Sequence, residues 1–464
     1  MKKPDVRIVL LFFIISLFLY FWDFDKKLIF DADQEYYANQ YVEIVKNHKL
    51  TLLGIETSVG KLFVGPLYTY CTAFIYWLFQ GDPIGIYLLT LFAVSFQASL
   101  TYILFTKLAT HGVGVFGGIF VFLALLLWGK AYAPSVINTL YPMGLLFFYA
   151  LGKLKEHKRY LPLLGFLLGL SLHLHVSLWI FFPIVLFVLF QQKKSYFFSK
   201  EFALTIGIIV LFLSPLLLFE LRHQFFVAKN ILLTVQHLSI TQPSSLPLEA
   251  GRRIYAVLTS FIILFTTILT PSARRVMYGF LCILIWYFFT HLGKHYLFRL
   301  SLLIFSTSFV IFLFYPGSLT DYYFYFQLAP FFFIVAFFFG SISQNKIGYQ
   351  ASIGIISVLT VINIQQMLYT INPYNLSLKK DVAAYIKAQT QDQPVQVYYD
   401  TDLGLQFGFD YLLRYKGVWL VDKPDNLIYQ IIIRSGNQMN GKIFYAPGSP
   451  VAIRVVQLDK AVIK

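Results

Sequence analysis

The sequence has few charged residues and very few cysteines. Only 13% of its 464 residues are charged, whereas about 25% is usual in soluble domains. A soluble core cannot absorb 50 Phe and 32 Tyr residues at this charge content, which favours an integral membrane protein. The two cysteines, Cys71 and Cys282, both lie inside apolar runs, so we expect buried free thiols without a disulfide or metal role.

Several common patterns are absent. No Gly-rich loop follows a predicted strand, so the chain has no nucleotide fingerprint. No internal repeat is visible, which weakens a transporter built from duplicated halves. Residues 1–22 have the basic start and apolar body of a signal peptide, but no small-residue cleavage site follows them. We therefore predict a retained first membrane span that begins in the cytoplasm.

The net charge of +15 has a distribution that excludes a nucleic-acid partner. The basic residues are not gathered on one domain but stand between apolar runs, which is the positive-inside pattern of membrane proteins. The basic hinges expected in the cytoplasm contain Lys107, Lys153, Lys155, Lys158, Arg159, Lys193, Lys194, Lys200, Lys294, Arg299 and Lys346.

The apolar runs predict a mostly α-helical, polytopic transmembrane bundle. The runs cover residues 7–22, 65–79, 84–104, 113–128, 136–151, 160–172, 174–190, 201–221, 254–270, 275–291, 296–315, 322–340 and 347–368. All basic hinges share one side with the N-terminus only if 65–79 and 254–270 lie at the outer surface without crossing. The sequence therefore predicts about eleven spans plus outer juxtamembrane helices.

The chain divides into two predicted domains. Residues 1–370 form the membrane domain, whose long first outer loop covers 23–83. Residues 371–464 are less apolar and predict a small extracytoplasmic α/β domain. In this tail the spacing predicts helices over 379–391 and 407–415 and strands over 395–399, 428–433 and 451–458.

The first outer loop carries the most informative motif, with Asp31, Asp33 and Glu35 directly after the first span. Carboxylates are costly near hydrocarbon, so a chain that keeps three of them there has a use for them. Two carboxylates two residues apart suit a general base with a supporting acid, or a divalent metal with oxygen ligands. A helix-capping Asp before the helical pattern of 34–46 is the alternative, and both roles can coexist.

The outer side also contains basic and aromatic candidates for binding an anionic lipid head group. Arg222 and His223 end a span, where they suit a lipid phosphate or an interfacial anchor. Other phosphate candidates are His173 and His175, in a polar hinge, and Lys61. Aromatic side chains stack on sugar rings and also form interfacial belts, and the candidates here are Tyr36, Tyr37, Tyr322 and Tyr323.

The order and spacing of these motifs resemble the GT-C glycosyltransferases. The motifs are Asp33-Gln34-Glu35-Tyr36-Tyr37-Ala38, Gly65-Pro66-Leu67-Tyr68, the His173/His175 hinge, Phe219-Glu220-Leu221-Arg222-His223, and Tyr322-Tyr323 with Pro330. The chain is similar to the branch of protein O-mannosyltransferases, lipid A aminoarabinose transferases and bacterial dolichyl-phosphate-mannose mannosyltransferase-like proteins.

The resemblance implies an inverting transfer of a sugar from a polyprenyl-phosphate donor at the outer face of a bacterial inner membrane. Asp33 matches the catalytic Asp of that family and would act as the general base that deprotonates the acceptor, Asp31 becomes a supporting acid, and Arg222 is the first choice for holding the departing phosphate. This branch generally works without a metal, although Asp31 and Asp33 could hold one. The acceptor is a glycan, a lipid or a protein.

Three other functions remain open at this stage. A lipid-linked sugar flippase predicts ionisable residues near mid-membrane, where this sequence has few. A polysaccharide polymerase or ligase also uses lipid-linked donors, but its decisive loop lies late in the chain. In a non-catalytic scaffold the acidic cluster would be incidental.

Overall fold

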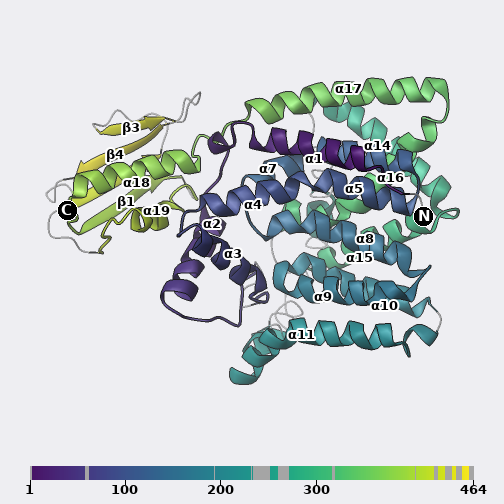
Figure 1. Cartoon of the computed structure of the whole chain (residues 1–464), viewed down its shortest axis with the longest axis horizontal. Helices are drawn as coiled ribbons and strands as arrows, with labels where there is room; N and C mark the ends of the chain where they lie inside the picture. Colours follow the sequence, from purple (N-terminus) through teal and green to yellow (C-terminus); the bar gives the residue numbers. More distant parts are fainter. Residues whose placement is uncertain are drawn as a thin grey trace.

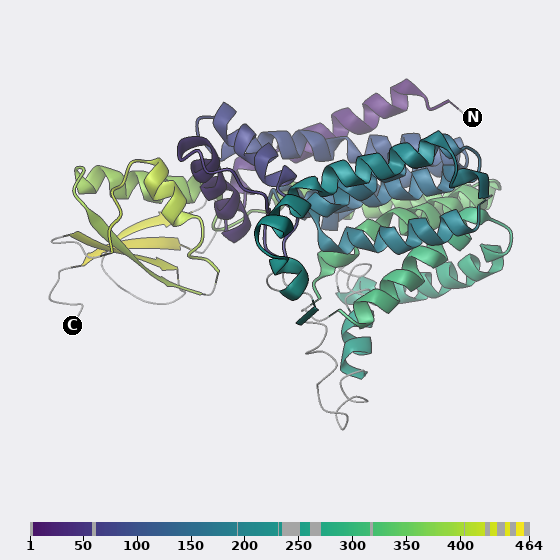
Figure 2. The same ribbon diagram turned by 90° about the horizontal axis from the view of Figure 1, so that it is seen from below.

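The computed structural model describes residues 3–57, 62–192, 194–230, 232–233, 251–259, 271–315, 319–402, 404–422, 427–433, 441–445 and 452–458. Two parts lie end to end in Figure 1: a bundle of long apolar helices that includes the N-terminus, and a small domain with the C-terminus. Helices α2 (Ala32–Tyr41) and α3 (Leu67–Leu78) lie between them, as Figure 2 also shows.

The bundle consists mainly of long helices. The earlier ones are α1 (Val6–Phe21), α4 (Ile84–Ser95), α5 (Gln97–Leu108), α6 (His111–Phe122), α8 (Leu140–Leu154) and α9 (Leu161–Leu174). The later ones are α10 (Phe181–Phe190), α11 (Lys200–Arg222), α14 (Pro271–Leu292), α15 (Tyr296–Leu313), α16 (Leu328–Ile342) and α17 (Lys346–Tyr369). Short turns η3 (Val136–Thr139), η5 (Val176–Ile180) and η8 (Asp321–Gln327) precede α8, α10 and α16.

Five of the described helices are long and apolar enough to cross a membrane, and shorter apolar helices accompany them. The five cover Ile84–Leu108, Lys200–Arg222, Tyr296–Leu313, Asp321–Ile342 and Lys346–Tyr369. The shorter ones cover Val6–Phe21, His111–Phe122, Val176–Phe190 and Tyr278–Leu292. The predicted polytopic helical bundle is thereby confirmed.

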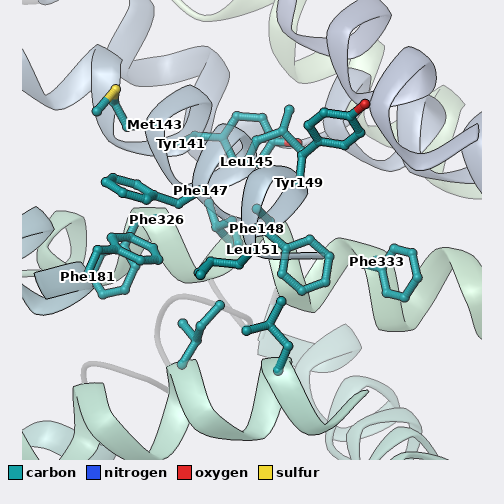
Figure 3. Packing of buried hydrophobic residues seen from close by; sticks show 14 of the residues in the cluster. Tyr141, Met143, Leu145, Phe147, Phe148, Tyr149, Leu151, Phe181, Phe326 and Phe333 are labelled. Atoms are coloured by element: carbon teal, nitrogen blue, oxygen red, sulfur yellow. The ribbon is translucent and has the colours of Figure 1, made fainter. Parts of the chain in front are cut away.

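The bundle is packed around α8, almost every residue of which is buried. Figure 3 shows aromatic side chains of α8 beside those of neighbouring elements, such as Phe181 and Phe333. Phe147 stacks on Phe181 with ring centroids 4.0 Å apart, and Phe148 meets Phe333 at 5.3 Å. Apolar side chains that interlock in this way fix the relative positions of α8, α10 and α16 by dispersion contacts as well as by burial.

The two segments assigned to the outer surface have different outcomes. Helix α3 has 12 residues, so it is about 18 Å long and too short for a hydrocarbon core of about 30 Å. It packs against α2 instead, in agreement with the prediction for 65–79. Of the segment 254–270, residues 260–270 lie outside the described residues.

One predicted span was wrong in its bounds. The apolar run 113–128 is interrupted, because α6 ends at Phe122 and a separate helix α7 covers Leu125–Ala131. Ala124 has an extended backbone, and the buried amide of Asn363 donates to the carbonyl of Leu123 at 2.7 Å. This side chain replaces the helical hydrogen bond that the break removes.

The tail forms the predicted small α/β domain. It contains α18 (Leu376–Thr390), α19 (Phe409–Tyr415) and the strands β1 (Val395–Thr401), β2 (Leu427–Ile433), β3 (Lys442–Tyr445) and β4 (Ala452–Leu458). The sheet order is β1-β2-β4-β3, with β1 and β2 parallel and the other pairs antiparallel. The sequence analysis missed β3, an edge strand of only four residues.

The tail domain and the first outer loop share one hydrophobic core. A single cluster of buried side chains joins Phe30 and Tyr41 in the loop region, Tyr76 on α3, and Val382 and Leu412 in the tail. The two parts on either side of the predicted boundary near residue 370 are therefore packed together.

Candidate active site

The segment that leads into α2 is held on both sides. Its residues run from Lys26, the last residue of η1 (Phe24–Lys26), to Phe30, and the carbonyl groups of Leu28, Ile29 and Phe30 point alternately to the tail and to the bundle. On the tail side, the carbonyl groups of Lys26, Leu28 and Phe30 accept from the backbone N–H of Asn372 (2.9 Å), the backbone N–H of Leu376 (3.0 Å) and Nζ of Lys379 (2.7 Å).

On the bundle side, Ile29 makes both of its backbone hydrogen bonds. The N–H of Ile29 donates to the carbonyl of Tyr132 at 2.8 Å, and the hydroxyl of Tyr87 donates to the carbonyl of Ile29 at 2.5 Å. Alternation is expected of an extended chain, whose successive groups face opposite sides. The start of α2 is therefore fixed from two directions.

Asp31 is the N-cap of α2, as the alternative reading of the motif expected. Its backbone N–H donates to Oε1 of Gln34 at 3.1 Å, which is the reciprocal half of a capping box. The amide of Gln34 in turn donates to the carbonyl of Pro134 at 3.0 Å. This arrangement places Asp33 in the first turn of the helix, with the N-terminal end of the helix dipole favouring its charged form.

Asp33 lies half-buried among aromatic side chains, close to one cation. Burial raises the pKa of its carboxyl group, the nearby charge of Asp31 adds to the increase, and Lys130 on α7 opposes it. The charge of Asp33 also acts on the hydroxyl groups of Tyr37, Tyr68 and Tyr322, which come from α2, α3 and η8. Asp33 is thus the point where these elements converge.

One of the tyrosines near Asp33, Tyr37, has a hydroxyl group without a hydrogen-bond partner among the described residues. The ring of Tyr37 contacts those of Tyr36 and Tyr68 edge-on, at 5.2 and 5.1 Å between centroids. Tyr37 is only 3% exposed, and its hydroxyl is buried. A buried hydroxyl without a partner is costly, so this one is available to a bound polar molecule.

Lys130 connects Asp33 to the second aromatic part of the site. Its Nζ lies 5.9 Å from the ring centroid of Tyr322, a distance typical of a cation–π contact. The ring of His175 meets those of Tyr322 and Tyr323 at 5.7 and 5.1 Å. Nδ1 of His175 accepts from the N–H of Ser177 at 3.2 Å, which leaves the proton of the neutral ring on Nε2.

Sequence reasoning missed Lys130 and Tyr68. Lys130 carries a usable signal, because it is a cation outside the basic hinges of the cytoplasmic side. It lies just beyond the predicted apolar run 113–128, and the break between α6 and α7 places it near Asp33. Tyr68 was seen as part of a family motif without a role of its own.

His173 holds the first outer loop rather than lining the site. It is 3% exposed, and its Nδ1 accepts from the N–H of Leu67 at 3.3 Å while its Nε2 donates to the carbonyl of Phe212 at 2.7 Å. A Cβ atom on Gly65 would lie 2.1 Å from Nδ1. Gly65 is therefore required for the loop to approach the imidazole, which connects it to α9 and α11.

Glu35 faces the tail domain. Its two carboxylate oxygens accept from the backbone N–H groups of Gly408 and Tyr411, at 2.9 and 3.0 Å. These groups start α19, so Glu35 caps that helix from a distant part of the chain. Burial raises the pKa of Glu35, and the two hydrogen bonds oppose the increase. With both oxygens engaged, it is placed to support the domain contact.

The structure does not bring Arg222 and His223 to Asp33. Both side chains are exposed at the end of α11, where the imidazole stacks on Phe219 with centroids 4.1 Å apart. They line a depression of about 400 Å³ together with Gln224 and Phe226. None of the interactions shown by the described residues joins them to Asp33. Lys61 lies outside the described residues.

An apolar cavity lies within the bundle, and Tyr68, whose hydroxyl is affected by the charge of Asp33, is one of its lining residues. Its walls come from α3, α4, α5, α8 and α9, with Ile75, Leu89 and Leu146 among the lining residues. Its volume is about 450 Å³. A cavity of this character suits part of a hydrocarbon chain, with the polar group of the same molecule at Asp33 and Lys130.

The described residues do not form a metal centre by themselves. They contain no group of three or more His, Cys, Asp or Glu side chains that could hold an ion. Asp31 and Asp33 supply two carboxylates, fewer ligands than Ca²⁺ takes, whereas Mg²⁺ is usually held by one or two carboxylates together with waters and substrate phosphates.

Comparisons with known proteins show the fold. No family model matches the chain, and no curated protein matches it either. Its structure is similar to that of ArnT, an aminoarabinose transferase from Cupriavidus metallidurans, crystallised with undecaprenyl phosphate. The TM-score is 0.57 at 12% identity, with 98% of each chain covered. The apo form of that protein gives 0.56 at 11% identity, covering 97% of this chain and 98% of the other.

A second similar structure is the Archaeoglobus fulgidus oligosaccharyltransferase, crystallised with zinc and sulfate. Here the TM-score is 0.51 at 12% identity, and the match covers 89% of this chain and 62% of the other. At such identities the likenesses show a shared arrangement of helices.

Proposed function

We propose that this integral membrane protein, which has the GT-C fold, is a glycosyltransferase that moves a sugar from a polyprenyl-phosphate donor to an acceptor. The observation that carries the proposal is the half-buried Asp33, whose carboxyl group lies near Lys130 and near Tyr68, a lining residue of the apolar cavity. A carboxylate, a cation and an apolar cavity close to one another supply groups that such a transfer needs.

The charge distribution supports an outward-facing site. The basic hinges, for example Lys107, Lys153 and Lys200, lie at the helix ends remote from the tail domain, while α2 and the tail lie at the other end (Figure 1). By the positive-inside rule the former end faces the cytoplasm. Asp33 and the tail domain then face the exterior of a bacterial inner membrane.

The apolar cavity and the polar groups near Tyr68 favour a donor with a hydrocarbon chain and a phosphate. The hydrocarbon chain of a polyprenyl phosphate would enter the cavity lined by Tyr68, and its phosphate would meet Lys130 and the unpartnered hydroxyl of Tyr37. The similarity to a protein crystallised with undecaprenyl phosphate supports this donor class. We place Lys130 ahead of Arg222 as the phosphate-binding cation, because Lys130 is the one near Asp33.

The proposed reaction is a single displacement. The carboxylate of Asp33 accepts the proton of an acceptor hydroxyl, and the oxygen attacks the anomeric carbon from the face opposite the lipid phosphate. The bond between that carbon and the phosphate oxygen breaks, and polyprenyl phosphate leaves with the electron pair. One such displacement inverts the anomeric centre. Lys130 stabilises the charge that develops on the phosphate, and Tyr322 and His175 complete the wall around the sugar.

The direct test uses purified protein and a panel of polyprenyl-phosphate sugars, with crude envelope acceptors present. Release of polyprenyl phosphate from at least one donor, dependent on the acceptor, is the expected result. Transport of intact lipid-linked sugar across vesicles without any release would contradict the proposal and favour the flippase.

The identity of the phosphate-binding cation is tested by two neutral variants. Lys130→Gln should raise the KM for the donor roughly 10- to 100-fold, because a charge-assisted hydrogen bond contributes about 1.5–3 kcal/mol. Arg222→Gln, the matched variant at the end of α11, should change it less than about twofold. Donor titration of initial rates measures both, and the reverse order would return the role to Arg222.

The pH dependence should follow the charges around Asp33. A general base works deprotonated, so transfer should fall as the pH falls through the raised pKa of Asp33. Removing the cation in Lys130→Gln raises this pKa further and should move the acid limb of kcat/KM to higher pH. Removing a like charge in Asp31→Asn should move it to lower pH, and Asn keeps the helix cap. If the acid limbs of the two variants moved in the same direction, or did not move, Asp33 would be excluded as the titrating group.

A further inference from the structure

Two cavities lie at the end of the bundle that is remote from Asp33. One, of about 320 Å³, lies between α10 and α15 and is lined by Lys155, Gln191, Tyr296 and Arg299. The other, of about 420 Å³, lies beside it and is also lined by Lys155 and Tyr296. The two hollows therefore flank one pair of residues, at the ends of the helices that carry the basic hinges.

The cations of the first cavity lack acidic partners. The carboxylates close by are taken by other lysines: Glu156 pairs with Lys153 at 2.8 Å and Glu201 with Lys158 at 3.4 Å. Within the described ranges, neither Lys155 nor Arg299 forms an ion pair. Two uncompensated cations at one cavity attract an anion.

Aromatic and apolar groups give the cavity the rest of its shape. Nζ of Lys155 lies 5.3 Å from the ring centroid of Tyr296, and the charge of Arg299 also reaches the hydroxyl of that residue. Phe187, Val188 and Leu303 form an apolar wall on the same cavity. A ligand with an anionic head and a hydrocarbon chain fits both parts, whereas a free anion uses only the first.

We propose that this cavity binds the phosphate of an anionic glycerophospholipid in the cytoplasmic leaflet. Lys155 and Arg299 hold the phosphate, and the wall formed by Phe187, Val188 and Leu303 receives an acyl chain. The lipid occupies the junction of α8, α10 and α15 on the face opposite the proposed transfer site. The proposal rests on the position of the basic hinges and not on the transferase activity.

The test measures lipid binding to the purified full chain by native mass spectrometry. Phosphatidylglycerol, phosphatidylcholine and inorganic phosphate are the three probes, and the main variant is Lys155→Gln combined with Arg299→Gln. Phosphatidylglycerol should bind, and the double variant should weaken it about 30-fold, since each basic residue near the surface contributes about a factor of five. Phosphatidylcholine should bind the two proteins alike.

The control removes the same amount of charge elsewhere on this face. Lys294→Gln combined with Lys346→Gln changes two exposed residues that line neither cavity, and it should retain the wild-type affinity. Equal losses in both double variants would show a diffuse surface effect and overturn the site. Binding of inorganic phosphate as tightly as of the lipid would overturn the lipid assignment. If the glutamine variant fails to fold, Lys155→Arg with Arg299→Lys keeps both charges and should keep the lipid selectivity, whose loss would equally contradict the proposal.

Discussion

Replacing Asp33 with Asn should reduce the turnover number for sugar transfer by a factor of about 10² to 10⁴, the usual contribution of a general base. The amide has nearly the same shape as the carboxylate but cannot accept the proton of the acceptor hydroxyl. Asp33 lies in the first turn of α2, and none of the interactions among the described residues joins it to the tail, so the fold should be retained. Initial rates of polyprenyl-phosphate release at saturating donor measure the effect.

The matched control is Asp25→Asn, an exposed Asp earlier in the same outer loop. It removes the same charge from the same side of the membrane and should leave the rate unchanged. Donor affinity of the Asp33→Asn protein should also stay within about threefold, since that residue acts in the chemical step. Wild-type transfer by Asp33→Asn would exclude the proposed mechanism.

Replacing Lys379 with Met should detach the tail domain from the first outer loop and destabilise the chain by about 3 kcal/mol. Lys379 is 2% exposed and donates to the carbonyls of Phe30 and Phe407, both at 2.7 Å. Burial lowers its pKa to about 8, while Asp31 and Glu35 favour its charged form. The Met variant leaves two carbonyl groups without a donor and two acids without their cation.

Hydrogen exchange measures this effect locally. Amides of α2 and α19 should exchange faster in the Lys379→Met protein, and transfer activity should fall because the start of α2 is no longer held. Lys416→Met, an exposed Lys next to the same domain contact, should leave exchange and activity as in the wild type. Unchanged protection of α2 in Lys379→Met would show that the tail does not position the helix.

The apolar runs predicted most of the helices because their cause is local. A run such as 201–221 must be helical in hydrocarbon, where every backbone group needs a partner within the segment, and α11 covers Lys200–Arg222. The same holds for α17, whereas the strands β1, β2 and β4 follow from short runs of β-branched and aromatic residues in the tail. The break between α6 and α7 was not predictable in this way, since its partner Asn363 is 240 positions away from Leu123.

The residues of the candidate site also differ in whether local sequence indicates them. Asp33 could be named as a candidate because an acidic cluster after a first span is unusual in itself. The positions of the other residues depend on contacts between distant segments. Glu35 contacts the start of α19, and His173 contacts Leu67. The place of Lys130 depends on where α6 ends. A motif such as Arg222-His223 has the right chemistry for phosphate, but only the packing of α11 shows that it ends away from Asp33.

The contact between Glu35 and the start of α19 can form only late in the synthesis of the chain. Glu35 and Gly408 are separated by 373 positions. At about 5–20 residues per second, a ribosome needs roughly 20 to 75 s to make the second partner after the first. During this interval the first outer loop lacks the tail domain that later holds α2, although most of the bundle has been made. We therefore expect a nascent chain stopped after α17 to insert into the membrane and yet transfer no sugar.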